Sequence, residues 1–295
     1  MDFYSFDPLI DSSNAHPGYW TELATVIEKS YDTYDGFVVL HGTDTMSYTA
    51  SALSFMLENL NKPVIFTGSQ LPLGVLRTDG RENFITAIEL AAAREEGVPV
   101  VPEVCIYFEN HLMRANRTLK YNAENFNAFI SPNYPLLAEA GIYLKFNKHN
   151  IFKANGNKLK VYKELDNSVG LLKLFPGIPK EFVYAVLNVP NQKAIILETF
   201  GAGNATTEPW FIDAVKQCVD SGTMVVNVTQ CMAGAVEMGK YDTSFLLRSI
   251  GVLSGYDSTT EAMLSKIMHL LGRKLTREQF IANMNSSLRG EISNV

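Results

Sequence analysis

The stretch Gly36-Phe37-Val38-Val39-Leu40-His41-Gly42-Thr43-Asp44-Thr45-Met46-Ser47-Tyr48 decides the fold prediction for this chain. Its first part, Gly36–Leu40, is an unbroken apolar run, which is typical of a parallel strand that is covered on both faces. A turn of small polar residues follows, and a helical pattern begins near Tyr48. A strand, a tight turn and a helix in this order indicate an α/β fold with a parallel sheet.

The same alternation continues along the chain. Further buried strands are expected at Pro63–Thr67, Val104–Phe108, Gly170–Phe175, Ala194–Leu197 and Thr223–Val228. Helical patterns lie at Tyr19–Tyr31, Tyr48–Asn59, Gly80–Glu95, Glu208–Asp220 and Thr259–Gly272. A segment rich in Asn and Lys interrupts this rhythm. We therefore predict two α/β domains with mostly parallel sheets, a larger one over residues 1–150 and a smaller one over residues 170–295, joined by a linker over residues 151–169.

The composition is that of an ordinary globular protein, with 46% hydrophobic and 19% charged residues among 295. A net charge of −6 without a basic patch gives the chain no electrostatic reason to bind nucleic acid or anionic lipid. No stretch is long and apolar enough to span a membrane. The spacing of the three cysteines fits neither a metal site nor a disulfide framework, which suggests a reducing compartment. Cys105 and Cys231 adjoin apolar runs and are expected to be buried.

The turn after Leu40 is the first candidate site, because open α/β sheets bind ligands at the carboxyl ends of their strands. Gly42 permits a tight turn, and the unpaired N–H groups of the incoming helix favour anions. Thr43 and Asp44 place a hydroxyl and a carboxylate at the same point, an arrangement suited to a zwitterion whose ammonium faces Asp44. Thr and Asp are also good helix N-caps, and the local sequence leaves both interpretations open.

Polar segments follow two other predicted strands. Thr67-Gly68-Ser69-Gln70-Leu71-Pro72 comes directly after one of them and is expected to line the same crevice. Beyond it, Asp79 and Asn83 are expected to bond the loop backbone.

Lys120 ends a polar loop that follows the strand at Val104–Phe108. A single lysine usually faces solvent. Placed beside Thr43 and partly desolvated, however, it would be suited to act as a base, because burial favours the neutral amine. Asp11-Ser12-Ser13, early in the chain, is by itself a turn or a cap.

Taken in order, these segments resemble the bacterial asparaginase and glutaminase-asparaginase family. The segments that carry the resemblance are Asp11–Ser13, His41–Thr45, Thr67–Gln70, Asn116–Lys120, Gly201–Asn204 and Asn227–Cys231. The similarity is strongest to the type I branch, through Thr49–Asn59, and it covers essentially the whole chain.

The resemblance implies hydrolysis of the side-chain amide of L-asparagine to L-aspartate and ammonia, in the cytoplasm and without metal or cofactor. It implies a homodimer or homotetramer of two-domain subunits. Thr43 and Lys120 would act in catalysis together with Asp44, which would also bind the substrate ammonium. The other implied substrate-binding residues are Asp11, Ser12, Ser13 and Asn204. In the family, the last of these comes from a neighbouring subunit.

One family motif has no counterpart in these 295 residues. The family's usual nucleophile lies in a Thr-Gly-Gly-Thr motif on its first strand, which the family pattern places before Met1. Met1–Ile10, with its alternating aromatic residues, corresponds to the strand that precedes Asp11. Loss of the nucleophile from a comparable hydrolase costs on the order of a million-fold in turnover. We therefore expect this chain to bind substrate poorly and to turn over little.

Two other functions remain open at this level. One is a glutamine-directed amidohydrolase, such as the asparaginase-like subunit of tRNA-dependent amidotransferases, although the acidic charge and the lack of a basic patch count against it. The other is an amino-acid-binding pseudoenzyme, which asparagine would stabilise without release of ammonia. Nucleotide binding is disfavoured, since the chain has no glycine-rich phosphate loop in the right context.

Overall fold

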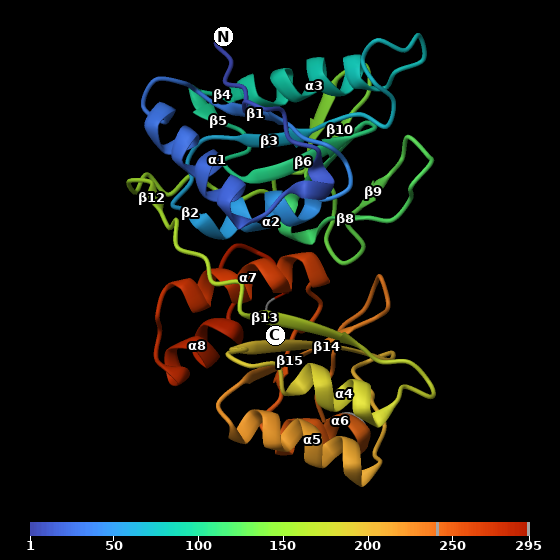
Figure 1. Ribbon diagram of the computed structural model, residues 1–295. Coiled ribbons are helices and arrows are strands. Elements are labelled where there is room, and N and C mark those ends of the chain that lie inside the picture. The colour runs from blue at the N-terminus through green and yellow to red at the C-terminus, as the bar shows by residue number, and fades with distance from the viewer. Residues whose placement is uncertain (240–241, 294–295) are drawn as a thin grey trace. The chain divides into compact units, whose positions relative to one another are not determined.

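The computed structural model describes residues 1–239 and 242–293, and it divides into two compact units between Lys163 and Glu164 (Figure 1). Each unit has a sheet with helices on both faces, as the strand and helix patterns predict. The boundary falls within the segment expected to be a linker. That segment includes β12 (Lys160–Val161), which pairs with β2 (Leu57–Glu58) and so belongs to the first unit.

The sheet of the first unit has the order β1-β3-β6-β7-β10-β11 within the described residues. These strands are β1 (Phe37–Leu40), β3 (Val64–Thr67), β6 (Val104–Phe108), β7 (His111–Arg114), β10 (Ala138–Ala140) and β11 (Leu144–Phe146). The first three are parallel, as expected from their apolar runs. The last three extend the sheet in antiparallel pairs, which the sequence did not predict.

Helices cover both faces of this sheet (Figure 1). One face carries α3 (Gly80–Ala92), whose Ala87 and Leu90 share a core cluster with Cys105 and Tyr107 of β6. The other face carries α2 (Met46–Met56), with α1 (Pro17–Ser30) packed against it. Side chains alternate between the faces of a strand, so β6 packs against α3 on one face of the sheet and against α2 on the other. The short elements are η1 (Ser12–Asn14), η2 (Ala115–Arg117), β4 (Arg94–Glu95), β5 (Val98–Pro99), β8 (Leu119–Lys120) and β9 (Phe129–Ile130).

The N-terminal segment is not a strand. The alternating aromatic residues of Met1–Ile10 predicted one, and that prediction is wrong, because a strand needs a hydrogen-bonded neighbour and this segment has none in the structure. Its side chains contact α1 instead: the Tyr4 hydroxyl donates to Glu22, and the Phe6 ring packs edge-on against Tyr19.

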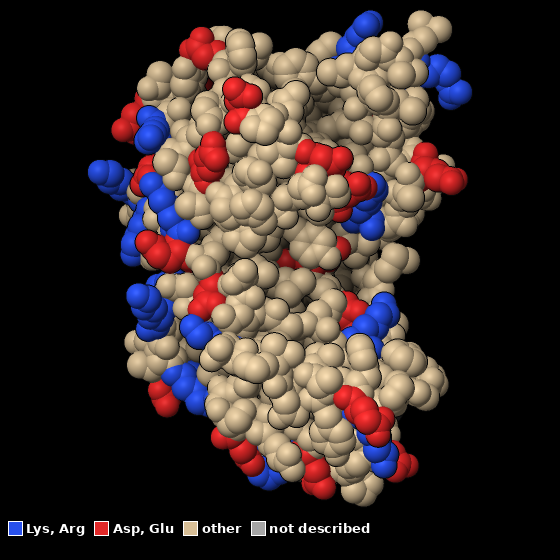
Figure 2. All heavy atoms as spheres, viewed as in Figure 1, with Lys and Arg blue, Asp and Glu red and all other residues tan. Residues whose placement is uncertain are grey.

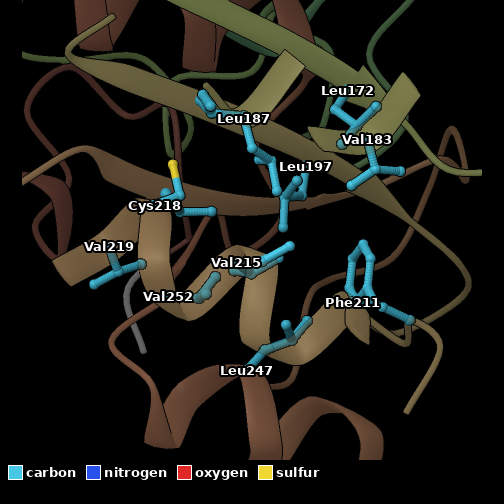
Figure 3. Close-up of a cluster of buried hydrophobic side chains, with 14 of the residues drawn as sticks. Leu172, Val183, Leu187, Leu197, Phe211, Val215, Cys218, Val219, Leu247 and Val252 are labelled. Atoms are coloured by element: carbon cyan, nitrogen blue, oxygen red, sulfur yellow. The ribbon is translucent and has the colours of Figure 1, made fainter. Parts of the chain in front are cut away.

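The second unit has a parallel sheet of order β13-β14-β15-β16 in its described part. The strands are β13 (Val169–Lys173), β14 (Ala194–Thr199), β15 (Met224–Thr229) and β16 (Leu253–Ser254). The helices are α4 (Lys180–Leu187), α5 (Pro209–Asp220), α6 (Asp242–Ser249), α7 (Thr260–Gly272) and α8 (Arg277–Met284). Leu197 of β14 packs with Phe211 and Val215 of α5 (Figure 3), while Ile196 joins the opposite cluster with Ile267 of α7.

The second unit also buries a lysine–glutamate pair. Lys266 of α7 and Glu291 are both 0% exposed, and Lys266 Nζ lies 2.6 Å from Glu291 Oε1. The ammonium also donates to the carbonyl oxygens of Met284 and Ser286, and the carboxylate accepts the N–H groups of Leu288 and Arg289. Every strong donor or acceptor of the pair is therefore engaged, which is what allows two charges to be buried together.

The three cysteines are free thiols. Cys105 lies in β6 and is buried, and burial raises the pKa of its thiol well above the usual value. Cys231 is exposed, so the expectation that it would be buried is wrong: it lies in the turn after β15 rather than in the strand. Among the described residues, no helix has the length and apolar character needed to cross a bilayer.

Candidate active site

The candidate site lies where β1 and β3 end. Parallel pairing sets Leu40 opposite Thr67, so the two polar turns that follow leave the same edge of the sheet. Gly68 makes their close approach possible, since a Cβ at this position would stand 2.3 Å from the carbonyl oxygen of His41. Burial lowers the pKa of His41, which keeps its ring neutral beside the site at neutral pH.

Lys120 reaches this edge from β8. Its Nζ donates to Thr43 Oγ1 at 2.8 Å and to Asp44 Oδ1 at 2.7 Å. The lysine side chain is only 18% exposed, whereas Asp44 is 63% exposed. The structure therefore brings Thr43, Asp44 and Lys120 into one hydrogen-bonded group, with the carboxylate still open to solvent. Such a group can pass a proton between a hydroxyl and an amine and can also attract a cation.

Gln70 is a further member of this group. The Thr43 hydroxyl donates to Gln70 Oε1 at 3.1 Å, and Gln70 Nε2 donates to the carbonyl oxygens of Ala123 and Asn125 at 3.3 and 2.9 Å. The sequence predicted the segment Thr67–Pro72 at the crevice without distinguishing Gln70 from its neighbours. Its place directly after β3 was the available signal.

Asp79 and Asn83 shape the turn that carries Gln70. The Asp79 carboxylate accepts the N–H groups of Gln70 and Leu71, and Asn83 Nδ2 donates to the carbonyl oxygen of Gly68. The expectation that these two residues bond loop backbone is confirmed.

The turn Asp11-Ser12-Ser13 packs against the Thr43 turn. Thr45 Oγ1 donates to the carbonyl oxygen of Ser12 at 2.6 Å, and a Cβ at Gly42 would stand 2.5 Å from Ser12 Oγ. Asp11 caps η1 by accepting the N–H and hydroxyl of Ser13, and these bonds lower the pKa of its carboxyl group. Ser12 thus borders the site, while the Asp11 carboxylate is engaged in the turn.

Asn204 belongs to the second unit, in the turn that follows β14. The N–H of Phe200 donates to the carbonyl oxygen of Asn204, and Asn227 Nδ2 donates to that of Gly203. Asn227 also accepts the hydroxyl of Thr199 at 2.6 Å, so a buried polar chain holds this turn.

Figure 2 shows acidic and basic side chains interspersed over the viewed face. A surface pocket adjoins Gln70 and is lined by Gln70, Leu71, Val75, Leu76, Arg77, Ala123, Glu124 and Phe126. Within the described residues, no group of three or more His, Cys, Asp and Glu side chains is placed to hold a metal ion.

Family models account for both units. Residues 4–152 match the N-terminal domain model named asparaginase, and residues 168–284 match the glutaminase/asparaginase C-terminal domain. The chain belongs to the asparaginase/glutaminase family. L-asparaginase 1 of Escherichia coli K12 is 45% identical over 98% of this chain and 84% of that protein. The crystal structure of L-asparaginase I from Vibrio cholerae is also 45% identical, with a TM-score of 0.91 over 99% of this chain and 86% of that one.

Two further relatives carry other names. The 60 kDa lysophospholipase of Mus musculus is 43% identical over 97% of this chain, which spans only 50% of that protein. A glutamyl-tRNA(Gln) amidotransferase subunit of Pyrococcus abyssi is 30% identical over 96% of this chain and 65% of that protein.

Proposed function

We propose that this protein hydrolyses the side-chain amide of L-asparagine to L-aspartate and ammonia. The observation that carries the proposal is the hydrogen-bonded group of Thr43, Lys120 and Asp44 at the ends of two parallel strands. The 45% identity to L-asparaginase 1 of Escherichia coli supports the choice of substrate. The amidotransferase alternative is less well supported, since the amidotransferase subunit of Pyrococcus abyssi shares only 30% identity.

Thr43 and Lys120 are suited to proton transfer in this reaction. Amide hydrolysis requires a base that takes a proton from the attacking group and an acid that protonates the departing nitrogen. The 2.8 Å contact allows the Thr43 hydroxyl to relay a proton to Lys120 once the amine is neutral. The resulting ammonium, held by Asp44, then returns a proton to the nitrogen that leaves as ammonia. The attacking oxygen forms a bond to the amide carbon as it loses its proton, and the C–N bond breaks as the nitrogen is protonated. Water supplies the new oxygen of the aspartate carboxylate, either by attacking directly or by hydrolysing an acyl intermediate.

Substrate recognition follows from the charges at the edge of this site. Asp44 is well exposed and is suited to bind the α-ammonium of the substrate. We assign the α-carboxylate side to Ser12, with Asp11 and Ser13 holding its turn. Asn204 would be contributed by a neighbouring copy in a homodimer or homotetramer, and the enzyme would work in the cytoplasm.

The decisive experiment measures ammonia release from L-asparagine and L-glutamine. The 295-residue chain is compared with the same chain extended at its N-terminus by a segment that carries Thr-Gly-Gly-Thr. We expect release from L-asparagine by the extended form and little by the shorter one. Activity of the shorter chain would contradict the need for the added motif. Asparagine-dependent thermal stabilisation of both forms without ammonia would instead support an amino-acid-binding pseudoenzyme.

A further inference from the structure

The side-chain amide of Gln70 has one possible orientation in this structure. Its Nε2 carries two hydrogens, and two carbonyl oxygens, those of Ala123 and Asn125, accept them. A rotated amide would bring Oε1 against these two oxygens and would lose both hydrogen bonds. The surrounding network therefore fixes Oε1 on the side of Thr43.

This orientation determines where the hydroxyl hydrogen of Thr43 points. The hydroxyl has a single hydrogen, which it donates to Gln70 Oε1, while its oxygen accepts from Lys120 Nζ. That polarity suits a protonated lysine, which can only donate. A neutral lysine amine offers a lone pair, and Thr43 can donate to it only by giving up Gln70. Gln70 and the neutral amine of Lys120 thus compete for one hydrogen.

We propose that Gln70 is a positioning residue that holds the hydroxyl hydrogen of Thr43 away from Lys120. It acts through Thr43 and not on the reacting atoms. The backbone carbonyls at positions 123 and 125 control it, because they hold its amide in place. The carbonyl groups lie in a loop that Asn122 shapes by accepting the N–H groups of Glu124 and Asn125.

The catalytic meaning of this arrangement rests on the proposed function. If Lys120 takes a proton through Thr43, the hydroxyl must first turn from Gln70 to the amine.

The test is a double-mutant cycle read by nuclear magnetic resonance, with carbon-13 at lysine Cε. The Lys120 signal is assigned by its loss in Lys120→Arg, and its titration midpoint is measured in the 295-residue chain without substrate. Gln70→Met keeps the length of the side chain but removes the acceptor. We expect it to lower the midpoint by roughly 0.5 pH unit, since one hydrogen bond is released to the neutral amine. In a Thr43→Val background, the same substitution should cause no shift.

One further variant separates the acceptor role of Gln70 from its hydrogen bonds to the loop, and another serves as a control. Gln70→Glu also loses both donors to the loop but keeps an acceptor for Thr43, so its midpoint should not fall. Gln279→Met is a matched control at the exposed start of α8, where Gln279 belongs to the capping box with Thr276, and it should leave the midpoint unchanged. Amide spectra and melting curves verify the fold of each variant.

The proposal is overturned if Gln70→Met causes no shift, if its shift persists in the Thr43→Val background, or if Gln70→Glu lowers the midpoint as Gln70→Met does. If Gln70→Met does not fold, the Gln70→Glu and Thr43→Val arms still decide: the Glu variant must raise the midpoint more with Thr43 present than without it. None of these measurements requires turnover. A chain that releases no ammonia therefore contradicts the proposed function and leaves this inference standing or falling on its own data.

Discussion

Two lysines of this chain bind carboxylates at nearly equal distances but in opposite surroundings. Lys120 lies 2.7 Å from Asp44, and Lys266 lies 2.6 Å from Glu291. Asp44 is largely exposed and the other partner of Lys120 is a hydroxyl, which can exchange a proton. The second pair is fully buried, and its other partners are backbone groups with fixed roles. A lysine–carboxylate pair is therefore a structural link in one place and, under the proposed function, takes part in proton transfer in the other.

The largest expected effect is a loss of turnover when Thr43, the hydroxyl partner of Lys120, is changed. In whichever form of the protein releases ammonia, Thr43→Val should lower kcat/KM on the order of ten-thousand-fold, because the hydroxyl beside Lys120 is lost. The assay is ammonia release at saturating and at low asparagine. Thr25→Val on α1 removes a hydroxyl that donates to the backbone carbonyl of Thr21, away from Thr43 in the sequence, and should retain activity. Equal losses in the two variants would refute the catalytic role.

The next effect concerns stability at the second pair. Lys266→Met leaves Glu291 buried without its counter-charge, so the free energy of unfolding should fall by about 3 to 5 kcal/mol. Urea unfolding gives this value. The double variant Lys266→Met/Glu291→Leu removes both charges and should recover part of the loss. A double variant less stable than the single one would show that the unpaired charge is not the cause.

A smaller effect is expected from acid, through His269 of α7. Burial lowers its pKa to about 3, and the charges of Arg273 and Arg289 add to the shift. The unfolded chain, with a histidine pKa near 6.5, binds the proton first as the pH falls. Stability should therefore decrease between pH 6.5 and 3, by up to about 1.4 kcal/mol per pH unit. Urea midpoints at pH 7 and pH 4 measure the slope, which should be shallower in His269→Gln. Parallel slopes would assign the acid sensitivity to other groups.

The smallest effect is expected on the stability of the protein when the pair of Lys120 and Asp44 is broken. Lys120→Met should change the free energy of unfolding by less than about 1 kcal/mol, because Asp44 is well exposed and water solvates it when the lysine is gone. The same urea experiment applies. A loss as large as that of Lys266→Met would remove the contrast between the two pairs.

The sequence predicted the parallel parts of both sheets and missed their extensions. Strands such as β3 and β6 are buried on both faces, so their apolar runs are unbroken. In contrast, β10 and β11 are three residues long and partly exposed, and so short a segment shows no periodicity. The eight-residue helices α4, α6 and α8 were missed for a similar reason, since they span little more than two turns.

The candidate site divides in the same way. Thr43 and Asp44 were predicted from their place after a strand, but Lys120 lies 77 residues from Thr43, and only the family resemblance connected the two. The orientation of Gln70 depends on the backbone carbonyls of Ala123 and Asn125, and every residue type carries such a group. No pattern of side chains signals a contact of that kind.

The link between Lys266 and Glu291 has a consequence for the order of events during synthesis. Glu291 follows Lys266 by 25 residues (291 − 266), so α7 is synthesised before the partner of its lysine. Until Glu291 emerges, the lysine has no counter-charge, and α7 cannot settle into its core without burying an unpaired ammonium. All strands of the sheet of the second unit precede Glu291 in the sequence. We therefore expect α7 to dock stably on this sheet only after Glu291 has been synthesised.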